Sequence, residues 1–223
     1  GETPRRWAKA VLRRTLYRRA VYRPRQQDRP FCVRLDISNT CNLRCPHCAY
    51  PASLAAGCKP QYMTPAEFRV LRRRVLRYAY VLQLACRFEA MMHPQFVEII
   101  RLLAEEPIPS AGMVTNGVLL EGERADALLD CKPLGEICVS VNSVSPDLYE
   151  RLHGRPMTGR VMANVEAFAA RRAEARRDDL RININTGAMR SNLQRLREVL
   201  EWGCRAGVDE VRFFHVDPFG PDN

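Results

Sequence analysis

Hydrophobic residues along the chain fall into two alternating patterns, short runs rich in β-branched and aromatic residues and longer stretches with apolar residues at three- and four-residue steps. The short runs predict β-strands, and the longer stretches predict amphipathic helices. The predicted strands cover residues 31–38, 80–86, 112–115, 136–142, 181–186 and 209–215. Strands that alternate with helices in this way indicate an α/β fold whose parallel strands are joined by right-handed crossovers.

Helix signals fill the intervals between these strands. Thr64 is a predicted N-cap, followed by Pro65 at the first helical position and by Glu67, which completes a capping box. The predicted helices cover residues 64–79, 91–105, 122–129, 157–177 and 191–206, with a further helix that begins at residue 145. The arginine-rich end of the 157–177 helix is expected to be solvated, and residues 50–61, where proline and glycine recur, are expected to form a loop.

Positive charge is concentrated at the N-terminus. The net charge is +10, and residues 1–29 hold nine arginines and Lys9 against Glu2 and Asp28, so that +8 of the total lies in this segment. Its apolar residues recur at helical spacing, which predicts an arginine-faced amphipathic helix that ends near Pro24. Three interpretations stay open: an arm packed on the outside of the domain, a surface for an acidic partner such as a leader peptide or nucleic acid, and attachment to an anionic membrane.

Length and composition bound the domain organisation. A chain of 223 residues with 46% hydrophobic residues can bury one core, so we expect one domain over residues 30–223 behind the basic helical extension of residues 1–29. Nine cysteines in a chain of this size, without a secretory signal, indicate a reducing, cytoplasmic setting. No apolar run reaches membrane-spanning length, so we expect no transmembrane segment.

Three of the cysteines stand together directly after the first predicted strand. Cys41, Cys45 and Cys48 are separated by three and two residues, so they can cover one face of a metal centre and leave one coordination position open. Closed structural zinc sites have four protein ligands, whereas a 4Fe-4S cluster held by three cysteines keeps one iron free. A zinc knuckle with His47 or Cys58 as fourth ligand, and reduced structural thiols, are the alternatives. For the cluster, Cys58 would be one thiol too many, so we treat it as incidental.

The CxxxCxxC spacing, with the ring of His47 just before the third cysteine, resembles the signature of the radical S-adenosylmethionine (radical SAM) superfamily. The resemblance implies a 4Fe-4S cluster on Cys41, Cys45 and Cys48, whose open iron binds the amino and carboxylate groups of S-adenosylmethionine. It also implies that the reduced cluster cleaves this cofactor and releases a 5′-deoxyadenosyl radical, which abstracts hydrogen from a substrate. A partial (β/α)6 barrel and an electron donor such as ferredoxin or flavodoxin follow from the same resemblance.

The resemblance continues at the ends of the next strands. Relatives usually carry Gly-Gly-Glu-Pro after the second strand, and this chain has Arg-Phe-Glu-Ala there. The resemblance implies that Glu89 binds the amino group of the cofactor. Phe88 then lies where the backbone of relatives would approach the cofactor. A Thr-Asn-Gly turn that contains Asn116 matches the family after the third strand. Ser140 and Asn142 occupy the family's Ser-Leu-Asp position, near the methionine carboxylate or ribose. The implied cofactor-binding residues are therefore His47, Phe88, Glu89, Asn116, Ser140 and Asn142.

Three residues are candidates to bind the carboxylate of S-adenosylmethionine. Many relatives bind it with an Arg-Gly pair, which is displaced here, so Arg151, His153 and Arg155 are rival replacements. The implied site residues gather at the carboxyl ends of predicted strands, where α/β folds collect their ligands.

The general layout, including His93-Pro94 and Asn192, looks most like the branch with a cysteine-rich C-terminal extension called SPASM, many of whose members modify peptides or proteins. The resemblance therefore implies a peptide or protein substrate. The last cysteine is Cys204, so this chain has no auxiliary-cluster cysteines beyond the sixth strand. Two other functions stay open: a catalytically degenerate relative, and a zinc-binding module that holds nucleic acid with the basic arm.

Overall fold

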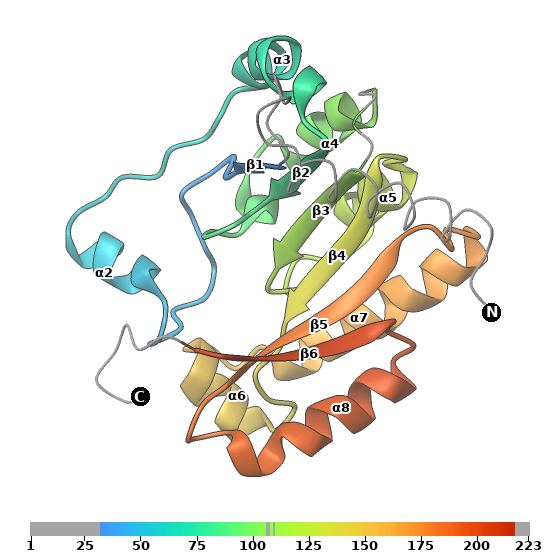
Figure 1. Cartoon of the computed structure of the whole chain (residues 1–223). Helices are drawn as coiled ribbons and strands as arrows, with labels where there is room; N and C mark the ends of the chain where they lie inside the picture. The colour runs from blue at the N-terminus through green and yellow to red at the C-terminus, as the bar shows by residue number, and fades with distance from the viewer. Residues whose placement is uncertain (1–31, 106–107, 109, 217–223) are drawn as a thin grey trace, which may run out of the picture.

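Six parallel strands form one sheet in the computed structural model, which describes residues 32–105, 108 and 110–216, the Arg77 side chain excepted (Figure 1). The sheet order follows the sequence order, and each strand pairs in parallel with the next. The strands are β1 (Cys32–Leu35), β2 (Val81–Leu84), β3 (Ser110–Thr115), β4 (Leu134–Ser140), β5 (Arg181–Ala188) and β6 (Glu210–His215). The predicted α/β class, a partial barrel of parallel strands, is confirmed.

Helices connect the strands. They are α2 (Ala49–Ala55), α3 (Pro65–Arg74), α4 (Phe96–Ala104), α5 (Gly122–Asp130), α6 (Pro146–His153), α7 (Thr158–Glu174) and α8 (Leu196–Arg205), with short 3-10 turns η2 (Leu76–Tyr78), η3 (Ala90–Met92) and η4 (Leu193–Arg195). Figure 1 shows α4, α5, α7 and α8 along the same side of the sheet, as crossovers of one hand require. The predicted capping box is present, because Oγ1 of Thr64 accepts from the Glu67 N–H at 3.2 Å and Oε2 of Glu67 accepts from the Thr64 N–H at 2.7 Å.

The face of the sheet opposite these helices is called the inner face here. A Cβ atom on Gly117 would lie 2.8 Å from Cγ1 of Val139 and 3.2 Å from Cγ1 of Val161, so Val139 on β4 points toward α7. Because side chains alternate along a strand, Cys138 and Ser140 point to the inner face.

Two predicted boundaries are wrong for local reasons. Residues 50–61, predicted as a loop, overlap α2: Cys48 has extended backbone and its Sγ accepts from the Tyr50 N–H, so it caps the helix, and Gly57 turns the chain with a φ of 77°. The helix predicted from residue 91 is divided into η3 and α4. Pro94 accounts for the break, because the residue before a proline is pushed out of helical conformation, and His93 has a ψ of 127°.

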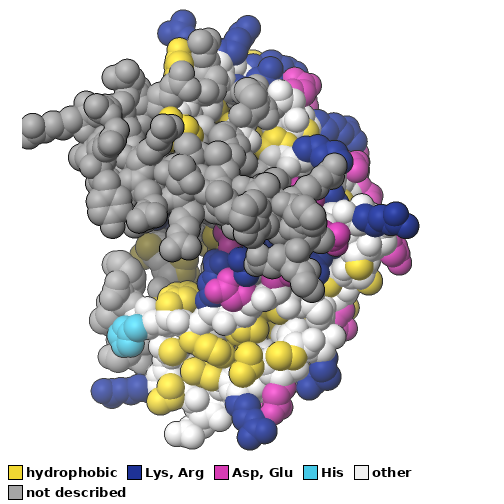
Figure 2. All heavy atoms as spheres, turned by 45° about the vertical axis from the view of Figure 1, so that its right-hand side comes forward, with side chains coloured by type: hydrophobic (Ala, Val, Ile, Leu, Met, Phe, Trp, Pro, Cys, Tyr) yellow, Lys and Arg dark blue, Asp and Glu magenta, His cyan; other side chains and the backbone are white. Residues whose placement is uncertain are grey.

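The surface carries both polar and apolar regions. Phe213 and Phe214, on the edge strand β6, are 43% and 50% exposed. Figure 2 shows a group of hydrophobic side chains on one part of the described surface, with basic and acidic side chains mixed along its right-hand side. Within the described ranges, no helix has the length and apolarity to cross a membrane. The predicted basic helix, with its candidate partners, falls on residues 1–29 and lies outside the described residues.

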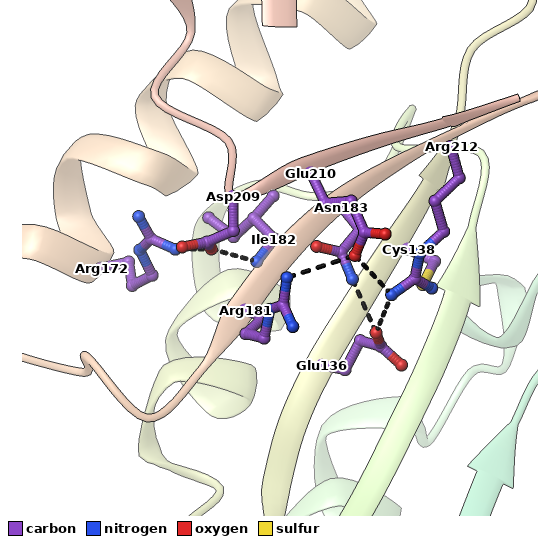
Figure 3. Close-up of polar contacts among 9 residues, drawn as sticks. All are labelled: Glu136, Cys138, Arg172, Arg181, Ile182, Asn183, Asp209, Glu210 and Arg212. Carbon is purple, nitrogen blue, oxygen red and sulfur yellow. Dashed lines mark hydrogen bonds and ion pairs between the residues drawn. The ribbon is translucent and has the colours of Figure 1, made fainter. Parts of the chain in front are cut away.

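The arginine-rich end of α7 is solvated only in part: Arg176 is exposed, whereas Arg172 and Arg177 are not. Arg177 is 5% exposed, donates to backbone carbonyls around the start of β4 and pairs with Asp179 at 2.9 Å. Arg172 pairs with Asp209, which also accepts from a backbone N–H at the start of β5 (Figure 3). Charged side chains at this end of α7 therefore join the helix to β4, β5 and β6, which periodicity alone does not reveal.

Candidate functional site

The loop with the three cysteines, residues 41–48, is held by backbone contacts on both sides. The Cys48 N–H donates to the Cys45 carbonyl at 3.0 Å, and the Arg44 N–H donates to the carbonyl of His153, the last residue of α6, at 3.0 Å. The Arg44 guanidinium turns back into the loop and donates to the carbonyls of Cys41 and Leu43 at 2.9 and 2.7 Å. The loop thus wraps around one arginine and lies on the end of α6.

Hydrogen-bond donors surround the sulfur atoms. Sγ of Cys41 accepts from the Leu43 N–H at 3.4 Å, and Sγ of Cys48 accepts from the Tyr50 N–H at 3.5 Å. Such N–H donors stabilise a thiolate more than a neutral thiol, which is the arrangement that a metal-binding cysteine needs.

Burial opposes ionisation of the Cys41 and Cys45 thiols when no metal is present. Burial raises the pKa of the Cys45 thiol to about 12, and the neighbouring Cys41 and Cys48 raise it further. Burial also raises the pKa of Cys41, with smaller opposing effects from the Leu43 N–H and Asn116 and a further increase from Glu89. The mutual effects place the three thiols in one electrostatic environment, and bound metal cations would remove their protons.

Glu89 lies just beyond the end of β2 and is 2% exposed. Its carboxylate accepts from the Asn116 N–H at 2.7 Å, from Oγ1 of Thr115 at 3.0 and 3.1 Å, and from the Met91 N–H at 3.3 Å. Burial raises the pKa of this carboxyl, and the hydrogen bonds from Asn116, Thr115 and Met91 lower it. The Glu89 N–H donates to the Thr40 carbonyl at 2.9 Å, which ties this acid to the residue before Cys41.

Asn116 joins the end of β3 to the cysteine loop. Its Nδ2 donates to Oδ1 of Asn42 at 2.7 Å and lies 3.7 Å from Sγ of Cys41, while its Oδ1 accepts from the Val118 N–H at 3.0 Å. Glu89, Asn116 and Cys41 therefore form one hydrogen-bonded group, built from segments that follow three neighbouring strands.

Residues at the end of β4 approach the same loop from the other side. Nδ2 of Asn142 lies 3.4 Å from Nε2 of His47, and Oδ1 of Asn142 accepts from the Gly187 N–H at 2.8 Å, which joins the ends of β4 and β5. Burial lowers the pKa of the half-buried His47 ring. Ser140 lies two residues before Asn142, half-buried on the inner face.

Phe88 lies apart from this group. Its ring packs edge-on against Tyr50 with 5.9 Å between centroids. It also lines a cavity of about 1140 Å³ with residues of the segment that follows β1 and of α3, including Ile37 and Val70. None of the three clustered cysteines lines that cavity. Phe88 thus supports the helix that Cys48 caps, and any effect on a cofactor would be indirect.

The three rival residues for the cofactor carboxylate are also separated. Arg151 and Arg155 are exposed, whereas His153 is 2% exposed beneath the loop. Both ring nitrogens of His153 have partners, because Nδ1 lies 3.6 Å from Sγ of Cys45 and Nε2 accepts from the Asn142 N–H at 3.2 Å. Sequence reasoning missed this contact, as well as the roles of Thr115 and Arg44. Thr115 could have been found from its place before Asn116, but local sequence offers no signal for the other two.

A sequence model described as the radical SAM superfamily matches residues 35–174. The chain belongs to the radical SAM superfamily. A GTP 3′,8-cyclase of Rhodococcus opacus is 31% identical over 193 residues, covering 86% of this radical SAM chain and 52% of the relative. A PqqA peptide cyclase of Bradyrhizobium diazoefficiens is 23% identical over 191 residues, covering 86% and 48%. The chain spans about half the length of the curated relatives it matches.

Solved radical SAM structures share the fold. Streptococcus suis SuiB bound to S-adenosylmethionine has a TM-score of 0.69 at 16% identity, with 92% of this chain and 46% of SuiB covered. The enzyme anSMEcpe with bound AdoMet has a TM-score of 0.60 at 17% identity, with 84% and 52% covered. These likenesses cover β1 to β6 in large part and support the partial-barrel description.

Radical SAM proteins use a 4Fe-4S cluster and S-adenosylmethionine, and three cysteine thiols with one open position are the donor set that such a cluster takes. One zinc ion would bring its thiolates to about 4 Å from one another, because each Zn–S bond is about 2.3 Å long. Among the residues that the structure describes, no three His, Cys, Asp or Glu side chains are placed to hold one ion. Cys58 is exposed and Nε2 of His47 faces Asn142, so the zinc knuckle is disfavoured.

Proposed function

We propose that this chain is the core of a radical SAM enzyme, in which Cys41, Cys45 and Cys48 hold the cluster. One observation carries the proposal: Asn116 donates its N–H to Glu89 at 2.7 Å and places Nδ2 at 3.7 Å from Sγ of Cys41. Glu89, which follows β2, and Asn116, which follows β3, thus meet the cysteine loop that follows β1. A degenerate relative would have no need to keep this buried acid beside the cysteines.

When bound, the cluster and S-adenosylmethionine supply the one-electron cleavage that yields a 5′-deoxyadenosyl radical. The protein residues bind and orient. Glu89 offers a buried carboxylate to the amino group of the cofactor, in a charge-assisted hydrogen bond that is strong because water is excluded. Asn116 holds that carboxylate in place, and Ser140, Asn142 and His47 provide hydrogen-bonding groups on the β4 side.

The substrate that we propose is a peptide or protein. SuiB has been solved with its precursor peptide SuiA, and PqqA peptide cyclase is a relative, although other relatives are GTP 3′,8-cyclases. On the inner face, Arg212 pairs with Glu136 and Glu210 at 2.7 and 2.8 Å and Arg181 pairs with Glu210 at 3.2 Å (Figure 3). These pairs lie near the amino ends of β4, β5 and β6, away from the carboxyl ends where the candidate site residues lie. The proposal of a peptide or protein substrate is therefore supported by the likeness to SuiB and to PqqA peptide cyclase.

Anaerobic reconstitution tests the proposed activity. The full chain, loaded with iron and sulfide and reduced with dithionite, should convert S-adenosylmethionine to 5′-deoxyadenosine, measured by chromatography. Cys45→Ala should lose both the cluster absorbance and the product, while Cys58→Ala, which removes an exposed thiol, should keep both. A full cluster in Cys45→Ala, or no 5′-deoxyadenosine from the wild type, would sink the proposal.

Calorimetric titration of the reconstituted chain with GTP tests the substrate class. We expect no saturable binding of GTP, because the proposed substrate is a peptide or protein. Saturable binding of GTP would show a nucleotide substrate instead, and would leave the cleavage chemistry standing.

A further inference from the structure

His153 lies directly beneath one cluster cysteine. It is the last residue of α6 and is 2% exposed, with Nδ1 at 3.6 Å from Sγ of Cys45. On the other side of the ring, the Asn142 N–H lies 3.2 Å from Nε2. The imidazole therefore bridges the cysteine loop and the end of β4.

The contact with Asn142 decides where the ring proton lies. A backbone N–H can only donate, so Nε2 must present its lone pair to Asn142. The ring proton is then on Nδ1, and Nδ1–H points at Sγ of Cys45. His153 is thus a donor to the sulfur.

Cys45 has no other such donor in the described part of the chain. Cys41 and Cys48 each accept from the backbone N–H two residues further on, at 3.4 and 3.5 Å. For Cys45, the donor from another residue is the His153 ring, beside the cysteine's own amide. A side chain from α6 takes the place that backbone fills for the other two sulfurs.

The ring of His153 is fixed in this orientation. Tyr149, one turn earlier in α6, stacks on it with 4.1 Å between centroids and an interplanar angle of 22°. The His153 carbonyl accepts from the Arg44 N–H at 3.0 Å, so the residue is tied to the loop by its backbone as well. Turning the ring over would separate Nε2 from the Asn142 N–H.

Tyr149 adds a second, independent sign that α6 faces a bound group. Its side chain is fully buried, and its hydroxyl has no hydrogen-bond partner among the described residues. The thiols of Cys45 and Cys41 contribute to raising the pKa of this hydroxyl, after burial itself, which places it near them. A buried hydroxyl without an acceptor is rare in a protein, and cluster sulfur is an acceptor of the right kind.

We propose that His153 is a positioning residue that donates a hydrogen bond from Nδ1 to the Cys45 thiolate and thereby raises the reduction potential of the cluster. The reduced cluster carries one more negative charge, so a donor to a ligand sulfur stabilises the reduced form more than the oxidised form. This inference rests on the proposed cluster site and adds to it the residue that tunes the cluster.

Two substitutions separate the donor from the structural bridge. The amide nitrogen of His153→Asn falls close to the former Nδ1 and can still donate to Cys45, whereas His153→Gln places its amide near the former Nε2 and can only replace the contact with Asn142. Each variant and the wild type are reconstituted anaerobically, and the potential is measured by redox titration followed by EPR, without S-adenosylmethionine. His93→Gln replaces a histidine that is 1% exposed at the end of η3, and it is the control for loss of a buried imidazole.

We expect His153→Gln to make cluster reduction about tenfold less favourable, a potential lower by about 59 mV for one electron. His153→Asn and His93→Gln should stay close to the wild type. An unchanged potential in His153→Gln, with a full cluster, overturns the inference but not the proposed function. A wild type that takes up no cluster overturns both.

Pulsed EPR decides the matter if His153→Gln does not hold a cluster. In the wild type labelled with ¹⁵N-histidine, the reduced cluster should show a histidine nitrogen coupling that is lost in His153→Asn. The same coupling in both proteins, or its absence from the wild type, overturns the role of His153.

Discussion

Gly154→Ala is the substitution that tests most directly whether the end of α6 supports the cysteine loop. Gly154 has a φ of 71°, and a Cβ atom there would lie 2.6 Å from the carbonyl oxygen of Arg44 and 2.9 Å from its carbonyl carbon. The positive φ costs an alanine about 1–2 kcal/mol. Pushing the Arg44 backbone away adds about 1–3 kcal/mol, the usual cost of overpacking, because a carbonyl in a fixed loop cannot turn aside as a flexible side chain can.

Gly207→Ala is a matched control, since Gly207 also has a φ of 71° but has no neighbouring atom within 4 Å of the place where a Cβ would lie. Urea denaturation should show Gly154→Ala to be less stable than Gly207→Ala by the contact cost alone, about 1–3 kcal/mol. Because the displaced residue lies between Cys41 and Cys45, reconstituted Gly154→Ala should also hold less iron per chain, measured by colorimetric assay. Equal stability and equal iron content in the two variants would refute the idea that this contact shapes the loop.

Three further predictions follow from individual contacts. Glu89→Gln should weaken S-adenosylmethionine binding, measured by equilibrium dialysis, by about 1.5–3 kcal/mol, because a charge-assisted hydrogen bond is lost. Glu98→Gln, at a half-exposed surface site, is the control. Equal affinities of the two variants for S-adenosylmethionine would contradict the role of Glu89. Burial raises the pKa of Cys45 from 9.0 to about 12, so above pH 9 the folded metal-free chain keeps a proton that the unfolded chain loses. The free energy of unfolding, measured by urea titration, should therefore fall above pH 9 by up to about 1.4 kcal/mol per pH unit. The fall should be less steep in Cys45→Ser, and identical slopes in the two proteins would contradict the raised pKa of Cys45. Thr64→Ala should lower the free energy of unfolding in urea by about 1 kcal/mol, because it removes the hydroxyl that accepts from the Glu67 N–H at 3.2 Å. Thr64→Ser, which keeps a hydroxyl there, should retain most of that stability.

The strands were predictable because each is a short apolar run closed by turn residues, and the parallel order followed from their alternation with helices. The missed α2 shows the limit of that reasoning. Proline and glycine between residues 50 and 61 indicate a loop, yet Pro51 falls in the first turn of α2, where its missing N–H costs nothing, and Gly57 comes after the helix has ended. The N-cap is Cys48, a residue type that no capping rule would select.

The candidate site also contains residues that could be predicted from the sequence and contacts that could not. The cysteines, Glu89 and Asn116 could be selected from the sequence because their motifs resemble those of radical SAM proteins. Parallel strands then bring these residues to one edge of the sheet. The contact between Cys45 and His153 spans 108 residues and depends on how α6 packs against the loop. The resemblance to radical SAM proteins indicated that Arg151, His153 or Arg155 would face the site, but only the fold distinguishes the buried histidine from the exposed arginines on either side.

The charges around the cysteine loop explain why the site should take up cations. Ionised Cys41, Cys45, Cys48 and Glu89 would bring four negative charges together, and the raised pKa values of Cys41, Cys45 and Glu89 show that the protein alone does not stabilise all of them. Arg44 offers one positive charge and directs its donors to loop carbonyls. Iron would neutralise the thiolates first, and the amino group of S-adenosylmethionine would then meet a carboxylate that no longer faces uncompensated sulfur, so cluster loading should precede tight cofactor binding.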